Sequence, residues 1–255
     1  MSAALVAVLV PLVALVAAAY ASVGLGGGTG YLALMTLLGV QHEALAPTAL
    51  TLNIVVTSVA MLRFGVAGRI RWGLLAPFLV FAIPAAFVGG MLPVPRQAFL
   101  GLLAVGLGLA AVAMLRSATR DDETISRPRP TVLWTVGPLV GAAIGLASGM
   151  LGIGGGIFLG PVLLLAAWAT PRETAAITSV TVLSLSVAGL AAHGIRGNVE
   201  PNLVAPLAIA VLAGGFVGAH LSETRFSAGT LKRIFAVIIL IAAVKAALTA
   251  AGVGS

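Results

Sequence analysis

The chain has 255 residues, of which 60% are hydrophobic and only 8% are charged. Because a soluble domain carries about 25% charged residues, this composition excludes an ordinary cytosolic enzyme, a disordered protein and a nucleic-acid-binding domain, and it indicates a polytopic membrane protein. The formal net charge of +7 comes from 14 basic and 7 acidic residues, and the basic ones stand between apolar runs, as in cytoplasmic loops of membrane proteins.

Ten apolar runs follow one another along the chain. They lie at roughly 3–23, 29–40, 44–64, 73–92, 98–116, 132–149, 157–169, 174–193, 203–221 and 229–250. A helix needs about 20 apolar residues to cross the hydrocarbon core, and eight of the runs reach or approach that length. The other two, 29–40 and 157–169, are short, and each follows a cluster of glycines. The sequence therefore predicts an all-α polytopic membrane protein with eight long spans and two short broken-helix segments.

One polar stretch, residues 117–130, divides the chain near its midpoint. It contains Ser, Pro and charged residues, a composition typical of a solvated linker. We therefore predict a first transmembrane repeat over residues 1–116, a polar cytoplasmic linker over 117–130 and a second transmembrane repeat over 131–255.

The two halves repeat each other at a nearly constant offset of 128 to 130 residues. Matching segments, in chain order, are 24–28 with 152–156, 48–51 with 178–181, 65–68 with 194–197, 76–77 with 205–206, and 87–89 with 216–218. Five matches in the same order indicate duplication, which is common among secondary transporters.

The distribution of basic residues predicts how the repeats are oriented. With five crossings in each half, 11 basic residues share one side, and Arg96, Arg196 and Lys245 lie on the other. With four crossings, in which each short run joins its neighbour as one broken span, the division becomes 9 against 5. The positive-inside rule favours the first arrangement, which gives inverted repeats with both termini outside.

The two glycine clusters, Gly26–Gly28 and Gly154–Gly156, are the strongest candidates for a ligand site. A glycine run interrupts a helix, and unwound backbone within a membrane is tolerated where it lines a cavity or is buried in protein. The short helix that follows each cluster begins with free N–H groups and the positive end of its dipole, which suit an anion. The alternative is close helix packing, which we favour for isolated glycines such as Gly89 and Gly141.

Polar side chains within the spans extend this candidate site. Thr48 and Thr51 share a helix face, and Thr178 and Thr181 repeat their spacing. Hydroxyls can donate to an oxyanion or bond back to their own helix, and both interpretations stay open. Asn53 is a mid-span amide that needs partners. The predicted substrate-binding residues are Gly26, Gly27, Gly28, Thr29, Thr48, Thr51, Asn53, Gly154, Gly155, Gly156, Ile157, Thr178, Ser179 and Thr181.

The sequence contains no pattern that predicts catalysis. There is no cysteine for thiolate chemistry or a cysteine metal site, no nucleophile paired with a base, and no His-Glu-x-x-His metal motif. We therefore expect no enzyme activity, no metal and no cofactor. The expected partners are a small anionic substrate and the lipid bilayer, without nucleic acid, and a homodimer stays open.

The glycine clusters resemble the signature of a known family. The segment Gly149-Met-Leu-Gly-Ile-Gly-Gly-Gly-Ile-Phe-Leu-Gly-Pro161 is similar to that of the TauE/SafE sulfite exporter family, also called TSUP, and Tyr20-Ala-Ser-Val-Gly-Leu-Gly-Gly-Gly-Thr-Gly-Tyr31 looks like its first-half counterpart. The segments 46–51 and 176–181 fit the same pattern. One departure is Ala33, which stands where the second half has Pro161. The two anion-binding cradles, formed by the glycine clusters and the helix starts that follow them, are therefore expected to be unequal.

The resemblance implies a multi-pass protein of the bacterial inner membrane that transports small sulfur-containing anions, such as sulfite, sulfoacetate or other organosulfonates. It points to Gly26–Gly28 and Gly154–Gly156 as the site; the threonine pairs and Asn53 come from our own analysis of the spans. Two other functions stay open: an anion channel, and a non-transporting membrane scaffold subunit.

Overall fold

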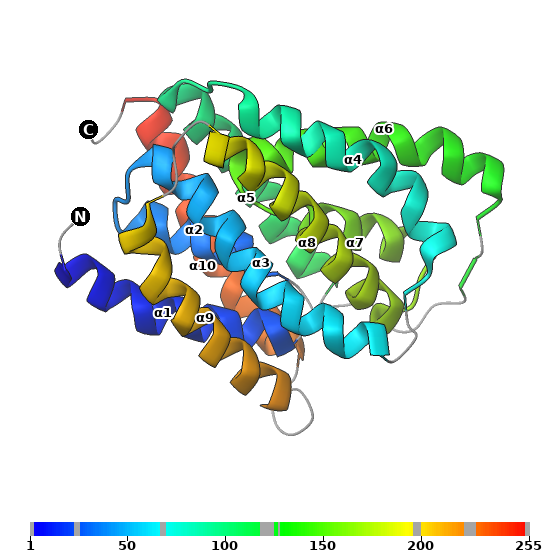
Figure 1. Cartoon of the computed structure of the whole chain (residues 1–255), viewed down its shortest axis with the longest axis horizontal. Helices are drawn as coiled ribbons and strands as arrows, with labels where there is room; N and C mark the ends of the chain where they lie inside the picture. Colours follow the sequence, from blue (N-terminus) through cyan, green and yellow to red (C-terminus); the bar gives the residue numbers. More distant parts are fainter. Residues whose placement is uncertain are drawn as a thin grey trace.

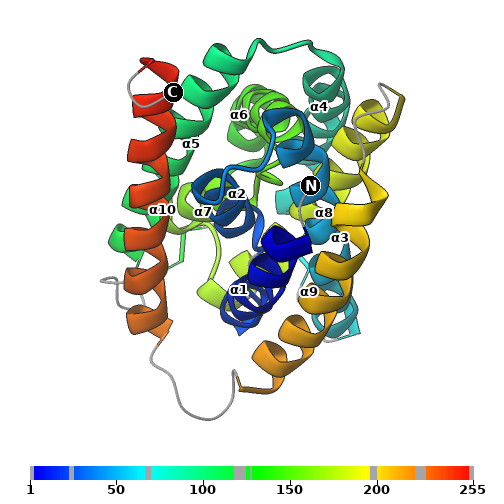
Figure 2. The ribbon, with the colours of Figure 1, turned by 90° about the vertical axis from the view of Figure 1, so that its left-hand side faces the viewer.

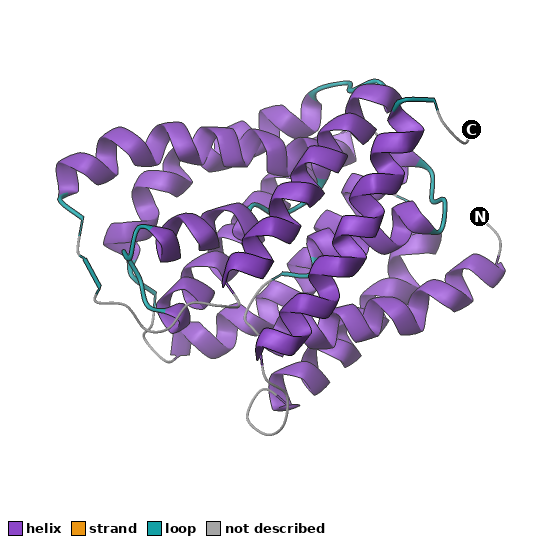
Figure 3. Ribbon diagram, turned by 180° about the vertical axis from the view of Figure 1, so that it is seen from behind, coloured by secondary structure: helices purple, strands orange, loops and turns teal. Residues whose placement is uncertain are grey.

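The computed structural model describes residues 3–22, 26–66, 70–117, 125–126, 128–195, 200–221 and 228–252. Within these ranges the protein is helical and contains no strand, as Figure 3 shows. The helices are α1 (Ala3–Ser22), α2 (Gly28–Leu37), α3 (His42–Val66), α4 (Trp72–Met91), α5 (Arg96–Ser117), α6 (Pro130–Leu151), α7 (Gly156–Leu165), α8 (Pro171–Ile195), α9 (Pro201–Leu221) and α10 (Ala228–Ala250). The predicted all-α class is confirmed.

The two halves of the chain carry helices in the same order of length. Helices α1 to α5 have 20, 10, 25, 20 and 22 residues. Helices α6 to α10 have 22, 10, 25, 21 and 23 residues. The short second member of each series, α2 or α7, begins at the last glycine of a cluster.

Five helices in the described part of the chain are long and apolar enough to cross a membrane. They are α3, α4, α6, α8 and α9, and shorter apolar stretches lie in α1, α5 and α10. Such lengths and hydropathy suit a multi-pass membrane protein. The predicted number of eight spans is not reached by this measure.

Local signals explain where the helices of the second half begin and end. Pro130 opens α6 at a position where proline loses no helical hydrogen bond. Gly152 closes α6 in the left-handed conformation, with φ of +78°, which glycine adopts without steric cost. Thr170 and Glu173 form a reciprocal capping box at the start of α8: each accepts a hydrogen bond from the other's backbone N–H.

The long helices pack in pairs that join the two halves of the chain. Helix α4 lies along α6, α1 along α9, α5 along α10 and α3 along α8 (Figure 1). The short helices lie inside this frame, where α2 contacts α3 and α10, and α7 contacts α8 and α5 (Figure 2). Each of these contacts has a counterpart in which the halves exchange places.

Isolated glycines allow the paired helices to approach closely. On α6, Gly141 and Gly145 face the backbone carbonyls of Phe78 and Ala82 of α4, so an added Cβ would clash with them. Gly218 of α9 faces the Ala18 carbonyl of α1 in the same way. The packing role that we favoured for Gly89 and Gly141 is confirmed, because a Cβ on Gly89 would likewise clash with the Leu146 carbonyl.

Candidate functional site

The two glycine clusters meet at the middle of α3 and α8. A Cβ built on Gly26 would lie 2.7 Å from Val182 Cγ1 and 3.4 Å from Asn53 Oδ1. A Cβ built on Gly154 would lie 2.8 Å from Asn53 Nδ2 and 2.8 Å from Val182 Cγ1. Asn53 and Val182 therefore each touch both clusters, and both are the twelfth residue of a 25-residue helix.

The start of α2 also faces the backbone of Ile153, the residue before the second cluster. A Cβ on Gly28 would lie 2.6 Å from the Ile153 carbonyl oxygen and 2.6 Å from Asn53 Nδ2. At the start of α7, a Cβ on Gly156 would lie 2.5 Å from Val182 Cγ2 and 3.4 Å from Thr178 Cβ. At these positions only glycine leaves the backbone open to a close approach.

The contacts follow the internal repeat of the sequence. An offset of 129 residues pairs Asn53 with Val182 and Thr57 with Ser186. Gly26 is bordered by Asn53, Val182 and Thr57, whereas Gly154 is bordered by Asn53, Val182 and Ser186. The surroundings of the two clusters are therefore equivalent in position but different in chemistry.

The backbones of the clusters differ as well. Gly154 and Gly155 have φ of +84° and +74°, in the left-handed region that favours glycine. Gly27 has φ of −77°, and Gly26 and Gly28 are not among the glycines of positive φ. The expected inequality of the cradles is seen here in the backbone itself.

Asn53 is the central polar side chain of this arrangement and is fully buried. Its Nδ2 donates a hydrogen bond of 3.4 Å to the Gly152 carbonyl, whereas its Oδ1 has no hydrogen-bond partner. Ser186 is also fully buried, and its Oγ has no partner. Buried polar atoms without partners are costly, so they mark a place where a ligand could supply the missing bonds.

The two short helices begin at the clusters without side-chain caps. The N-cap residues are Gly27 for α2 and Gly155 for α7, and neither makes a side-chain cap hydrogen bond. The first-turn N–H groups of a helix need acceptors, and the helix dipole adds about half a positive charge there. In α7 the N–H groups of Gly156 and Phe158 already donate to the Gly154 and Gly155 carbonyls, so the Ile157 N–H is the first-turn donor that these bonds leave for an anion.

Most of the predicted hydroxyl donors bond within their own helix. Thr51 donates to the Pro47 carbonyl, Thr178 to Thr174, Ser179 to Ala176 and Thr181 to Ile177. Thr48 differs, because its buried Oγ1 has no partner. Thr29 pairs with the Tyr20 hydroxyl at 3.1 Å, and the side chain of Ile157 is buried and apolar.

The structure thus brings together only part of the predicted site. Gly26, Gly28, Gly154 and Gly156 gather around Asn53 and Val182, with Thr178 beside Gly156. The nearest neighbours of Gly27 and Gly155 are neither Asn53 nor Val182. The Tyr31 ring borders Gly27, and Leu185 and Ile144 border Gly155.

Three residues at this centre were missed in the sequence. They are Val182, Thr57 and Ser186. Applying the repeat offset to Asn53 would have found Val182, which is apolar and carried no chemical signal of its own.

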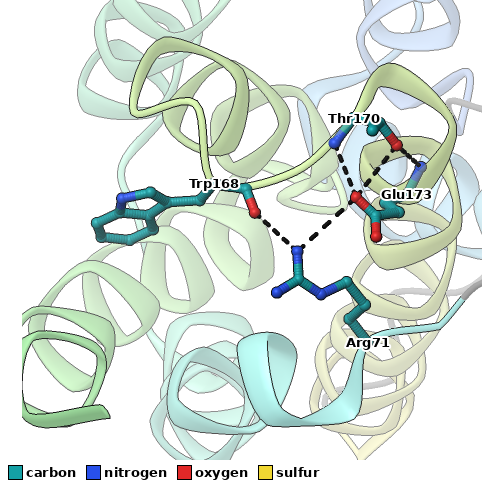
Figure 4. A network of polar contacts seen from close by, with 4 residues as sticks. All are labelled: Arg71, Trp168, Thr170 and Glu173. Atoms are coloured by element: carbon teal, nitrogen blue, oxygen red, sulfur yellow. Dashed lines mark hydrogen bonds and ion pairs between the residues drawn. The ribbon is translucent and has the colours of Figure 1, made fainter. Parts of the chain in front are cut away.

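A second polar cluster joins the two halves at the start of α4 (Figure 4). Arg71 Nη1 donates a hydrogen bond of 3.0 Å to the Trp168 carbonyl and lies 3.8 Å from Glu173 Oε2. The same Oε2 accepts the Thr170 backbone N–H at 2.9 Å. Arg71 therefore fastens the start of α4 to the loop between α7 and α8.

The comparison with known families decides the identity of the chain. The model of the sulfite exporter TauE/SafE family matches residues 9–246. The chain belongs to the TauE/SafE sulfite exporter family. Its two glycine clusters and the meeting point at Asn53 all fall inside the matched region.

Two curated relatives of the chain are named as membrane transporters. The chain is 36% identical over 230 residues to a "Probable membrane transporter protein y4hK" of Sinorhizobium fredii, covering 90% of this chain and 93% of the relative. It is 27% identical over 234 residues to a "Probable membrane transporter protein" of Xylella fastidiosa, covering 86% and 87%. No solved structure matches the chain. The protein is a membrane transporter of the sulfite exporter type.

Proposed function

We propose that this protein is a secondary transporter that moves small sulfur-containing anions, such as sulfite, sulfoacetate or other organosulfonates, across the bacterial inner membrane. The observation that carries the proposal is the meeting of the two glycine clusters at Asn53, halfway along α3 and α8. Transporter sites favour broken helices in corresponding positions of two repeats. Membership of a sulfite exporter family supports a sulfur oxyanion as the substrate class.

The anion binds near the midplane of the membrane, between the starts of α2 and α7. Backbone N–H groups at the two glycine clusters, Gly26–Gly28 and Gly154–Gly156, and the dipoles of both short helices hold its oxygens. The Gly156 N–H is not among these donors, because it bonds to the Gly154 carbonyl. Asn53 completes the site from α3, and Thr48 is the predicted hydroxyl that has no competing bond within its helix. All of these groups belong to one chain, so the site is complete in a monomer.

The two repeats are inverted, and transport proceeds as one repeat rocks against the other. Three observations support this arrangement: the equal order of helix lengths, the pairing of helices across the halves and the asymmetry of basic residues. Since the glycine clusters border residues of both α3 and α8, a relative movement of the halves would change access to the site.

Reconstitution into liposomes tests the proposal. Sulfite flux should be saturable and should be lost in Gly27→Leu and Gly154→Leu, because the larger side chains meet Tyr31 or Asn53. Gly108→Leu is the matched control, since a Cβ at Gly108 meets nothing within 4 Å. Wild-type flux in both cluster variants would refute the cradle.

Two other outcomes would favour the alternatives. Steady single-channel currents far above transporter turnover would indicate an anion channel that shares the same cradle. Copurification of a stoichiometric partner protein, together with no flux of any anion, would indicate a scaffold subunit.

A further inference from the structure

The orientation of the Asn53 amide sets which of its atoms faces the candidate site. Nδ2 donates to the Gly152 carbonyl at 3.4 Å, and a rotated amide would place two oxygen acceptors against each other. The hydrogen-bond network therefore assigns Oδ1 as the atom that is left without a partner. Asn53 is fully buried, so bulk water does not satisfy that oxygen.

This oxygen stands among the groups that the proposed anion would contact. It lies 3.4 Å from the position of a Cβ on Gly26 and 3.0 Å from that of a Cβ on Gly28. The Ile153 carbonyl oxygen lies 2.6 Å from the same position at Gly28. A cradle of N–H donors thus contains two hydrogen-bond acceptors at its centre.

An acceptor in an anion site discriminates between anions by their protons. A fully deprotonated oxyanion can only accept hydrogen bonds, so Asn53 Oδ1 would stay unsatisfied and would repel it. An anion that also carries an O–H or N–H would satisfy this oxygen while its charged oxygens face the helix starts. Sites with buried polar groups reject ligands that fail to pair them.

We propose that Asn53 makes the site select a singly charged anion that carries a hydrogen-bond donor, such as hydrogen sulfite, over anions that only accept. The inference rests on the proposed function, since it specifies the form of the anion in the same site. The selection is one-sided, because the equivalent position in the second half is Val182, which has no polar atom.

Binding of sulfite and methanesulfonate to the detergent-purified protein, at one pH below and one above the second pKa of sulfurous acid, tests this proposal. Sulfite changes from a proton-bearing monoanion to a bare dianion between the two conditions, whereas methanesulfonate stays an acceptor-only monoanion. The affinity for total sulfite should fall about tenfold at the higher pH, as expected for the loss of one buried hydrogen bond. The affinity for methanesulfonate should stay nearly constant.

Methanesulfonate also controls for titration of the protein. Charged or titratable groups on α3 itself are His42, Glu43 and Arg63, and those on the helices packed against it are Tyr20, Tyr31, Arg172, Glu173, His193 and His220. A change in any of them would alter the binding of both anions, so the ratio of the two affinities isolates the proton of the ligand.

The variant Asn53→Val separates the amide from the charge of the ligand. Valine already occupies the equivalent position 182, and the variant should bind sulfite with the same ratio to methanesulfonate at both pH values. Ser58→Ala is the matched control on the same helix, because the Ser58 hydroxyl bonds only back to the Ile54 carbonyl, and it should keep the wild-type pH dependence.

Equal wild-type affinity for sulfite at both pH values would overturn the inference while leaving the proposed function standing. A pH dependence that survives in Asn53→Val would overturn it too, because charge alone would then explain the selection. Binding of neither anion under any condition would overturn the proposed function and this inference together. If Asn53→Val does not fold, the wild-type comparison at the lower pH still decides, because hydrogen sulfite and methanesulfonate carry the same charge there and only hydrogen sulfite has a donor; equal affinities for the two would overturn the inference.

Discussion

Gly28 has a hydrogen atom where any other residue would place a carbon against the Asn53 amide and the Ile153 carbonyl. Both of those groups are within 2.6 Å of the added Cβ position, closer than real Cβ contacts come. The equivalent glycine of the second half, Gly156, is enclosed by Val182 in the same way. At the scale of single residues, the site is therefore defined by the absence of side chains around one buried amide.

The substitution Gly28→Ala tests this requirement with the smallest change available. The added methyl group must displace the Asn53 amide or the Ile153 carbonyl, so we expect sulfite affinity to fall by about tenfold or more, equal to roughly 1.4 kcal/mol. Isothermal titration of the detergent-purified variant measures this. Gly101→Ala, where an added Cβ meets nothing within 4 Å, should bind as the wild type does. Unchanged affinity in Gly28→Ala would mean that the ligand lies elsewhere.

The sequence predicted that the glycines belong to this site, but it did not predict which groups the neighbouring hydroxyls bond to. A repeated Thr-x-x-Thr spacing places two hydroxyls on one face, yet Thr51, Thr178 and Thr181 donate to carbonyls one turn earlier in their own helices. Spacing fixes which residues share a face but not which neighbour that face meets. Val182 shows the converse, because an apolar residue gives no chemical signal although it borders both clusters.

At the scale of helices, close contact between α4 and α6 depends on a row of small residues. A glycine recurs every four residues along α6, at Gly137, Gly141, Gly145 and Gly149. The first faces Pro77 of α4, and the other three face backbone carbonyls of α4. Such rows let helices approach in lipid, where packing rather than hydrophobic burial drives association. The same device joins α9 to α1 at Gly214 and Gly218.

Replacing Gly145 with alanine tests the importance of this helix pair. A Cβ there would clash with the Ala82 carbonyl, which belongs to backbone and cannot rotate away, so the helices must separate. We expect the free energy of unfolding to fall by about 1–3 kcal/mol, the usual cost of overpacking. The measurement is the midpoint of thermal unfolding, which should be lower. Gly73→Ala on α4 is the control, since it meets nothing within 4 Å; equal midpoints for the two variants would contradict the packing role.

Helix type and order were predictable from the apolar runs because long runs with glycine interruptions specify where helices start and stop. The two 10-residue helices α2 and α7 begin at the glycine clusters, as the sequence indicated. Tertiary pairing was not predictable in the same way. Nothing in the sequence of α4 alone states that its partner is α6 rather than its neighbour α5, because every long helix is apolar on most of its surface.

At the scale of the whole molecule, each of the four pairs α4 with α6, α1 with α9, α5 with α10 and α3 with α8 contains one member from each half. The proposed inverted orientation predicts on which side of the membrane the linker and the end of α10 lie. The linker near Ser126 and the end of α10 near Ala251 should lie on opposite sides of the membrane, whereas parallel repeats of four crossings would place them on the same side.

Single-cysteine labelling measures this directly, because the natural sequence contains no cysteine. Ser126→Cys should be protected from an impermeant maleimide in intact cells, while Ala251→Cys should react; both positions are exposed in the structure. Gln97→Cys, also exposed, is the marker for the outer side. Reaction of Ser126 and Ala251 from the same side would rule out inverted repeats of five crossings.

The central claim is that the two glycine clusters and Asn53 bind a small sulfur oxyanion. The most direct measurement is thermal unfolding of the detergent-purified protein with sulfite, thiosulfate, sulfoacetate, taurine, sulfate, acetate and chloride at equal ionic strength. A ligand at about 100 times its Kd stabilises a protein by roughly 2.7 kcal/mol. We predict selective stabilisation by a sulfur oxyanion, which Gly154→Leu abolishes. Equal midpoints with all seven anions, or a shift that persists in Gly154→Leu, would contradict the account.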